Sequence, residues 1–76
     1  MEMIKRPENM RMTLKTAREL AGYTQASAAK AIGVSADTLL NYEKGKSYPD
    51  IPVLRKIEEV YKVRYSQLIF LPMDFG

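Results

Sequence analysis

Apolar residues recur every three or four positions through most of this chain, and that spacing predicts helices. Four helices are expected over 14–21, over 25–32, over 36–44, and from Ile51 to just before Val63. The capping residues that precede them are Thr13, Thr24, Ser35 and Asp50. A last helix is expected from about Ser66 to Leu71, where Pro72 ends it. The pattern therefore predicts a compact all-α fold of five helices.

Two of these helices have clear apolar faces. The first is expected to bury Leu14, Ala17, Leu20 and Ala21, and the fourth Ile51, Leu54, Ile57, Val60 and Tyr61. Arg18 lies between apolar positions of the first helix, so we expect it to point partly inward. These faces predict one shared hydrophobic core.

The stretch 23–46 predicts two short helices joined by a tight turn. Gly33 can take the left-handed conformation that ends the first helix, and Gly45 closes the second. Isolated helices shorter than about 12–15 residues are marginal in water, so these two must be stabilised by packing. Ala29 leaves room for a near-perpendicular crossing. The spacing predicts helix-turn-helix geometry.

The second of these helices has two different faces. Leu39, Tyr42 and Glu43 lie on one side, and Ala36, Asp37, Leu40 and Asn41 on the other. We expect the first side to be buried and the second to be presented to a partner.

Composition excludes several kinds of chemistry. The 76 residues suffice for one small domain, and they include no cysteine and no histidine. Disulfides, thiolate nucleophiles, imidazole bases and the usual zinc ligands are therefore absent, and no metal or cofactor is expected. An enzyme would need paired carboxylates, but Glu58 and Glu59 are adjacent on a helix and diverge. We expect neither catalysis nor a small-molecule ligand.

The charge balance is modestly basic. A net charge of +3 and a pI of about 9.3 favour a polyanionic partner without establishing one. The apolar runs are much shorter than the about 20 residues that span a bilayer, and no secretory h-region is present. We therefore expect a cytoplasmic protein that does not enter a membrane.

The helix-turn-helix stretch resembles the phage repressor and Cro-type (XRE) DNA-binding domains. The resemblance lies in Thr24-Gln25, Ala29, Gly33-Val34-Ser35, Leu39, Tyr42-Glu43 and Gly45, and extends to Arg18, Pro49, Leu54 and Leu68. It covers about residues 13–71 and implies a lambda-repressor-like fold with a buried ion pair between Arg18 and Glu43. Arg64 departs from the family, which often has a capping Ser or Thr there.

The resemblance also implies a site on double-stranded DNA. A helix fits the major groove, so base edges would be read by Ser35, Ala36, Asp37, Leu40 and Asn41. Phosphates would be bound by Thr24, Gln25, Lys44, Lys46 and Ser47. Asp37 has a second interpretation, because a carboxylate in a first turn is stabilised by the helix dipole even without DNA.

Three regions are expected: an arm over 1–12, the helix-turn-helix domain over 13–71 and a tail over 72–76. Lys5 and Arg6 of the arm either reach DNA or belong to a disordered leader. Apolar residues over 65–75 exceed what one short helix can bury, which favours either a homodimer or a tail folded over its own core.

The function expected from this reasoning is sequence-specific transcriptional regulation. A small repressor or Cro-like switch of phage or mobile-element origin would place helix 36–44 in the major groove of a near-palindromic operator. The alternative is an antitoxin or a protein-interaction module on the same fold.

Overall fold

The computed structural model describes residues 11–70. Its elements are, in chain order, β1 (Met12–Thr13), α1 (Leu14–Leu20), α2 (Gln25–Ile32), α3 (Ala36–Lys44), α4 (Ile51–Tyr61), the 3-10 turn η1 (Tyr65–Gln67) and β2 (Leu68–Ile69). The two strands pair in parallel, with Met12 opposite Leu68 and Thr13 opposite Ile69. No helix within 11–70 is long and apolar enough to cross a membrane.

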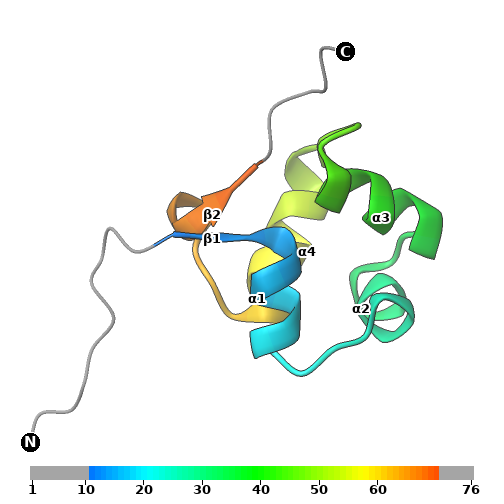
Figure 1. Ribbon diagram of the computed structural model, residues 1–76, viewed down its shortest axis with the longest axis horizontal. Helices are drawn as coiled ribbons and strands as arrows, with labels where there is room; N and C mark the ends of the chain where they lie inside the picture. Colours follow the sequence, from blue (N-terminus) through cyan, green and yellow to red (C-terminus); the bar gives the residue numbers. More distant parts are fainter. Residues whose placement is uncertain (1–10, 71–76) are drawn as a thin grey trace, which may run out of the picture.

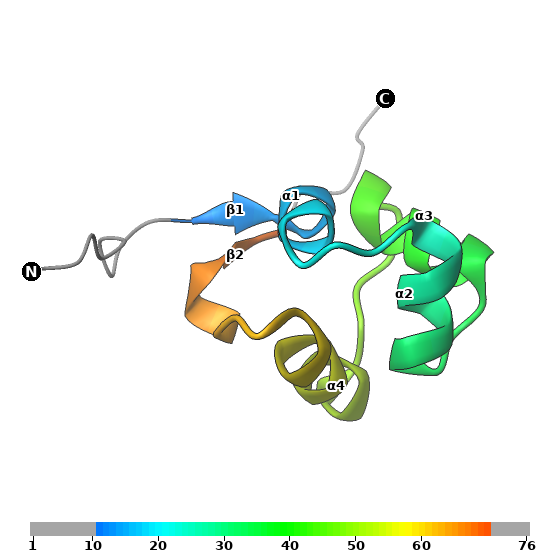
Figure 2. The same ribbon diagram turned by 90° about the horizontal axis from the view of Figure 1, so that it is seen from below.

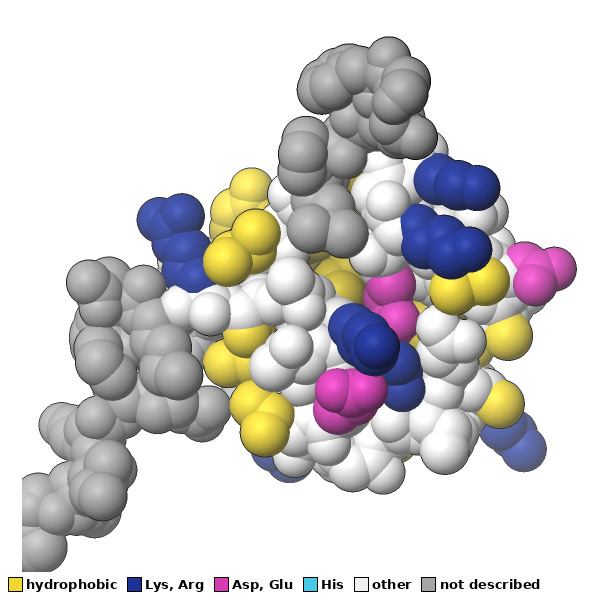
Figure 3. Space-filling view, in the orientation of Figure 1, with side chains coloured by type: hydrophobic (Ala, Val, Ile, Leu, Met, Phe, Trp, Pro, Cys, Tyr) yellow, Lys and Arg dark blue, Asp and Glu magenta, His cyan; other side chains and the backbone are white. Residues whose placement is uncertain are grey.

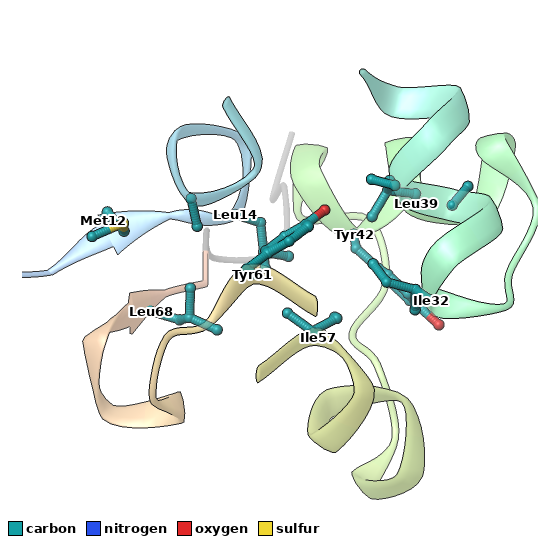
Figure 4. Packing of buried hydrophobic residues seen from close by; sticks show 11 residues of the cluster. Met12, Leu14, Ile32, Leu39, Tyr42, Ile57, Tyr61 and Leu68 are labelled. Atoms are coloured by element: carbon teal, nitrogen blue, oxygen red, sulfur yellow. The ribbon is translucent and has the colours of Figure 1, made fainter. Parts of the chain in front are cut away.

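The helices surround one core, and the strands close it at one end. Figure 1 and Figure 2 show α2 and α3 together on one side of the molecule, with the strand pair on the opposite side of α1. Figure 4 shows buried side chains from the four helices and both strands gathered in this core. Leu39 of α3 and Ile57 of α4 are its largest fully buried side chains. The fold therefore anchors α3 to the core through one face.

The helix boundaries follow from local capping. Thr13, Thr24, Ser35 and Asp50 each precede a helix, and each side chain accepts a hydrogen bond from the backbone N–H three residues later. This confirms the four expected caps. At the turn between α2 and α3, Gly33 has a φ of 96°, a left-handed conformation that glycine adopts without a Cβ clash.

The fifth expected helix is absent from 65–70, so the prediction of five α-helices was wrong. One 3-10 turn, Tyr65–Gln67, is followed by extended backbone at Leu68 and Ile69. A helix of so few residues gains few hydrogen bonds. The extended form instead buries Leu68 to 7% exposure and pairs it with β1. The described part is mostly helical, with a very small parallel sheet.

Three apolar positions assigned to the core lie on the surface. Leu20 is 67% exposed and Ile51 is 62% exposed, while Ala21 is also exposed. Leu20 is six positions after Leu14, which rotates it away from the stripe that Leu14 and Ala17 bury. Ile51 is the first residue of α4, so it extends beyond the part of that helix that faces the core.

Met12 belongs to the folded body, although the sequence placed it in the N-terminal arm. It is 6% exposed and lies in β1. The rest of the expected arm, including Lys5 and Arg6, lies outside the described residues except for Arg11, and so does the tail over 72–76.

Candidate nucleic-acid interface

α3 presents one face to solvent while its other face enters the core. Leu39 is fully buried and Tyr42 is 9% exposed, so these two side chains fix the rotation of the helix. Ala36, Asp37 and Asn41 on the opposite face are exposed. Leu40 is half-buried at the edge of that face. α3 therefore offers a short polar strip of the kind that can enter a groove.

A buried ion pair connects α1 to the C-terminal end of α3. The Nε of Arg18 lies 2.7 Å from the Oε2 of Glu43, and Nη2 donates to Oε1 at 3.3 Å. Both side chains are buried, with 9% and 5% exposure. Nη1 donates to the carbonyl oxygen of Tyr23 at 3.1 Å. The structure thus brings Arg18 and Glu43 together in a bidentate pair, and the guanidinium also holds the loop before α2.

The environment of this pair favours the charged form of Arg18. The hydrogen bond from its guanidinium to Glu43 raises the pKa of Arg18 above its already high ordinary value, and this effect outweighs the opposing effect of burial. Arg18 consequently stays protonated at every pH at which the domain would work.

Gln25 connects the ion pair to the start of α2. Its Nε2 donates to Oε1 of Glu43 at 3.1 Å, so part of the amide faces the protein rather than solvent. The backbone N–H groups of Gln25 and Ala26 lie in the first turn of α2, where no intrahelical acceptor exists for them. This corner retains donors for an anion, with the side-chain orientation set by Glu43.

The four other candidate phosphate contacts lie at the two ends of the helix pair. Thr24 is exposed, but its hydroxyl accepts from the Ser27 N–H in a capping box. Lys44 and Lys46 are exposed on either side of Gly45, and Ser47 beside them is half-buried. Lys46 is held in place by its backbone N–H, which donates to the Asn41 carbonyl at 2.9 Å.

Ser35 has a structural role in the turn. Its Oγ accepts from the Thr38 N–H at 3.0 Å, and its hydroxyl lies 2.9 Å from Oγ1 of Thr38. The side chain is exposed, yet both hydrogen bonds are local. Among the expected base readers, Asp37 and Asn41 therefore carry the exposed polar groups that have no capping role.

Charge is distributed unevenly over this side of the molecule. Figure 3 shows Lys and Arg side chains over the α3 side, with acidic and apolar side chains next to them. Asp37 in the first turn of α3 places a carboxylate near the positive end of the helix dipole. The interface combines cations at the end of α3 with a negative charge at its start.

Sequence reasoning missed several contacts that shape this site. The Gln25–Glu43 hydrogen bond, the Tyr23 carbonyl bound by Arg18, and the Thr24–Ser27 capping box were not expected. Of these, only the capping box left a local signal, because Thr24 and Ser27 are three residues apart, which is the spacing of reciprocal capping. Over residues 11–70, no three acidic side chains come together as a metal-binding group.

Comparison with known proteins agrees with this architecture. A helix-turn-helix family model matches residues 14–68. The chain is 39% identical over 56 residues to the HTH-type transcriptional regulator ImmR of Bacillus subtilis, covering 74% of the chain and 44% of ImmR. It thus spans less than half of the length of that relative. No solved structure is significantly similar to the chain.

Two archaeal relatives match over most of their own length. An uncharacterised HTH-type transcriptional regulator of Archaeoglobus fulgidus is 36% identical over 59 residues, covering 78% of the chain and 84% of that protein. Another uncharacterised HTH-type transcriptional regulator, from Methanocaldococcus jannaschii, is 34% identical over 65 residues, covering 86% of the chain and 98% of that protein. The family match and the geometry of α2 and α3 lead to one assignment: the chain belongs to the XRE-type helix-turn-helix family.

Proposed function

We propose that the protein is a sequence-specific transcriptional regulator that binds near-palindromic operators as a homodimer. The observation that carries this proposal is the division of α3, which buries Leu39 and Tyr42 and exposes Ala36, Asp37 and Asn41. A helix anchored along one side and polar along the other fits the major groove of B-DNA. The relatives whose names describe transcriptional regulators support the same conclusion.

In the proposed complex, base edges are read from the exposed face of α3. Asn41 bonds to adenine N6 and N7, Asp37 accepts from cytosine N4, and Leu40 or Ala36 packs on a thymine methyl group. Ser35 lies at the edge of this face, with its hydroxyl engaged in capping. Since few exposed polar groups are available, DNA shape contributes to the choice of site.

Phosphate contacts bracket the recognition helix in this proposal. The first turn of α2 supplies the backbone N–H groups of Gln25 and Ala26, next to Thr24, while Lys44, Lys46 and Ser47 bind the backbone beyond the end of α3. Glu43 positions the Gln25 amide rather than contacting DNA. These contacts supply affinity and salt dependence but no sequence information.

Occupancy of an operator would block polymerase, as in a small repressor or Cro-like switch of phage or mobile-element origin. One domain makes few contacts, and two domains on half-sites about 34–36 Å apart bind far more tightly. Control would then come from the concentration of the protein.

Selection from a pool of random duplexes, sequenced after several rounds, tests this function. We expect enrichment of a two-fold symmetric motif, with binding that weakens as salt rises. Enrichment of no motif, or binding indifferent to salt, would contradict a DNA-reading role and favour an interaction module on the same fold. The matched control is the double variant Lys44→Ala, Lys46→Ala. It removes two of the proposed phosphate contacts but leaves the base-reading face of α3 intact.

A further inference from the structure

A small pocket lies where α1 and α4 end, next to β1. Its volume is about 400 Å³, within the range of about 300–1,000 Å³ in which proteins bind small molecules. We define the helix-end pocket by six of its lining residues, which are Met12, Leu20, Tyr23, Tyr61, Lys62 and Val63. None of the residues proposed to contact DNA lines it. The pocket is thus made by a different set of residues from the proposed DNA-binding surface.

The interior of the helix-end pocket is apolar and fixed in position. Met12, Ala17 and Tyr61, which line it, are buried in the core. The ring centroids of Tyr23 and Tyr61 lie 6.1 Å apart, with the ring planes tilted by 40°. Leu20, by contrast, is one of the large apolar residues left exposed. The pocket therefore combines rigid walls with exposed apolar surface, and a preformed site of this kind lowers the entropy cost of binding.

Lys62 is the single charged residue among the described residues that line the pocket. It is exposed, and its ammonium group makes no ion pair with another residue of 11–70. A cation that lacks a counter-charge in this part of the chain, next to an apolar pocket, favours a ligand with one negative charge and one apolar part.

The backbone of Lys62 has a left-handed conformation that usually selects glycine. Its φ is 58°, and it is the one non-glycine residue within 11–70 that has a positive φ. Its N–H donates to the carbonyl oxygen of Glu58, so the end of α4 holds this conformation in place. Residues in such strained conformations cluster at functional sites. A lysine here, where glycine would fit without strain, therefore points to a role for its side chain.

We propose that the helix-end pocket binds a small carboxylate that carries a short apolar chain. The chain lies against the rings of Tyr23 and Tyr61, and the carboxylate stays at the rim, paired with the ammonium group of Lys62. The helix ends favour this orientation, because α1 ends at Leu20 and α4 at Tyr61. The C-terminal carbonyl groups of both helices carry partial negative charge and repel a carboxylate placed deeper.

The size of the pocket favours a small molecule over a protein partner. A stable protein interface uses about 20–30 residues from each side, and far fewer line this pocket. Its walls come from β1, α1 and the end of α4, which meet only after folding, so no local sequence signal indicated it. A carboxylate of the size of octanoate should bind weakly, with a Kd on the order of 1 mM.

Titration of the full chain with octanoate up to about 10 mM, followed by the backbone amide signals in NMR spectra, tests the proposal. We expect saturable shifts at Leu20, Tyr23, Lys62 and Val63. Two probes of the same chain length separate charge from apolar contact: 1-octanol is neutral and octylammonium is a cation. Octylammonium should bind more weakly than octanoate, because its charge faces that of Lys62.

The test variant is Lys62→Gln, and the matched control is Lys56→Gln, which removes an equal charge from an exposed position of α4 outside the pocket. Lys62→Gln should weaken octanoate binding about two- to fivefold, as the loss of an exposed ion pair does, and leave 1-octanol binding unchanged. Lys56→Gln should change neither, and Lys62→Arg should restore octanoate binding. Circular dichroism checks that the variants fold.

A substitution in the apolar wall locates the chain of the ligand. Leu20→Gln should weaken octanoate and 1-octanol alike, by about threefold, because both lose the same apolar contact. Leu20 is exposed, so this variant is expected to fold. An effect on neither probe would place the apolar chain outside the pocket and contradict the proposal.

Four further results would overturn the proposal. Octanoate could cause no saturable shift up to about 10 mM, as it would if the chain's own residues 1–10 or another protein filled the pocket. The shifts could fall on Lys44 and Lys46 instead, which would assign anion binding to the proposed DNA-binding surface. Octylammonium could bind as tightly as octanoate, or Lys62→Gln could behave like Lys56→Gln. No DNA is present in these titrations, so their outcome is independent of the proposed function.

Discussion

The guanidinium of Arg18 and the carboxylate of Glu43 are 25 positions apart in sequence and 2.7 Å apart in space. Both groups are buried near the C-terminal end of α3. Arg18 belongs to α1 and Glu43 to α3, and Gln25 of α2 donates to the same carboxylate. One acidic side chain therefore connects three helices. This arrangement determines how α3 is oriented relative to the start of α2.

Replacing the Glu43 carboxylate with a neutral amide should destabilise the fold. Glu43→Gln leaves the buried guanidinium without its counter-charge, and we expect the free energy of unfolding to fall by about 3–5 kcal/mol. Urea denaturation measures this loss. The control is Glu59→Gln, which breaks an exposed pair with Lys56 at 3.7 Å and should cost less than about 1 kcal/mol. Equal effects of the two substitutions would show that the buried pair contributes no more than the exposed one.

A second stability prediction concerns Tyr61, which is 4% exposed. Its hydroxyl has no hydrogen-bond partner among residues 11–70. A buried hydroxyl without a partner costs about 1–3 kcal/mol, so Tyr61→Phe should raise the free energy of unfolding by about 1 kcal/mol. Tyr65→Phe, at a 56% exposed position, should change it by less than about 0.5 kcal/mol. A lower unfolding free energy for Tyr61→Phe would mean that the hydroxyl has a stabilising partner.

Stability should also depend on Tyr61 in alkaline solution. Burial raises the pKa of Tyr61 from about 10 to about 12. Above pH 10 the unfolded chain loses this proton while the folded chain keeps it, so the stability that is fully present below pH 10 declines between pH 10 and pH 12. The decline from this group is at most about 1.4 kcal/mol per pH unit. The urea concentration at the midpoint of unfolding should fall less steeply with pH in Tyr61→Phe than in the wild type. Identical slopes of this midpoint against pH would contradict the prediction.

Asn41→Ala tests base reading directly. The exposed amide is expected to discriminate at one base pair, so its loss should cost about 1–3 kcal/mol on the selected site and relax the preference at that position alone. Binding to duplexes carrying each of the four base pairs there measures the change. A loss of the same size on random DNA would assign Asn41 a non-specific role.

Lys46→Ala tests a phosphate contact. Affinity should fall alike for specific and random duplexes, and the slope of log affinity against log salt should become smaller by about one. Lys56→Ala, on α4, removes an equal charge and should leave the slope unchanged. If Lys46→Ala behaved like Lys56→Ala, the loop after α3 would not lie along the DNA backbone.

Local signals made much of the fold predictable. The four capped helix starts could be expected because a cap depends on the residues of one turn, and the buried face of α3 because Leu39 and Tyr42 follow the helical period. The sequence has no glycine at the end of α4 that would mark where this helix stops. Its cap, Lys62, has a φ of 58° in a conformation that usually selects glycine.

The features that sequence could not supply depend on distant residues. Leu68 is extended because its backbone pairs with that of Met12 and its side chain is buried in the core. Neither interaction can be inferred from the residues next to Leu68 in sequence. The apolar surface groove lined in part by Ile51 and Tyr65 arises similarly, since these two residues come from separate segments that meet only after folding. The contact between Gln25 and Glu43 requires the angle between α2 and α3, which spacing alone does not determine.

The parallel pairing of Met12–Thr13 with Leu68–Ile69 brings the start and the finish of the described fold to neighbouring positions. Figure 1 and Figure 2 both place that pair on the side of α1 away from α2 and α3. Extra sequence joined ahead of β1 would therefore begin at a distance from the recognition helix.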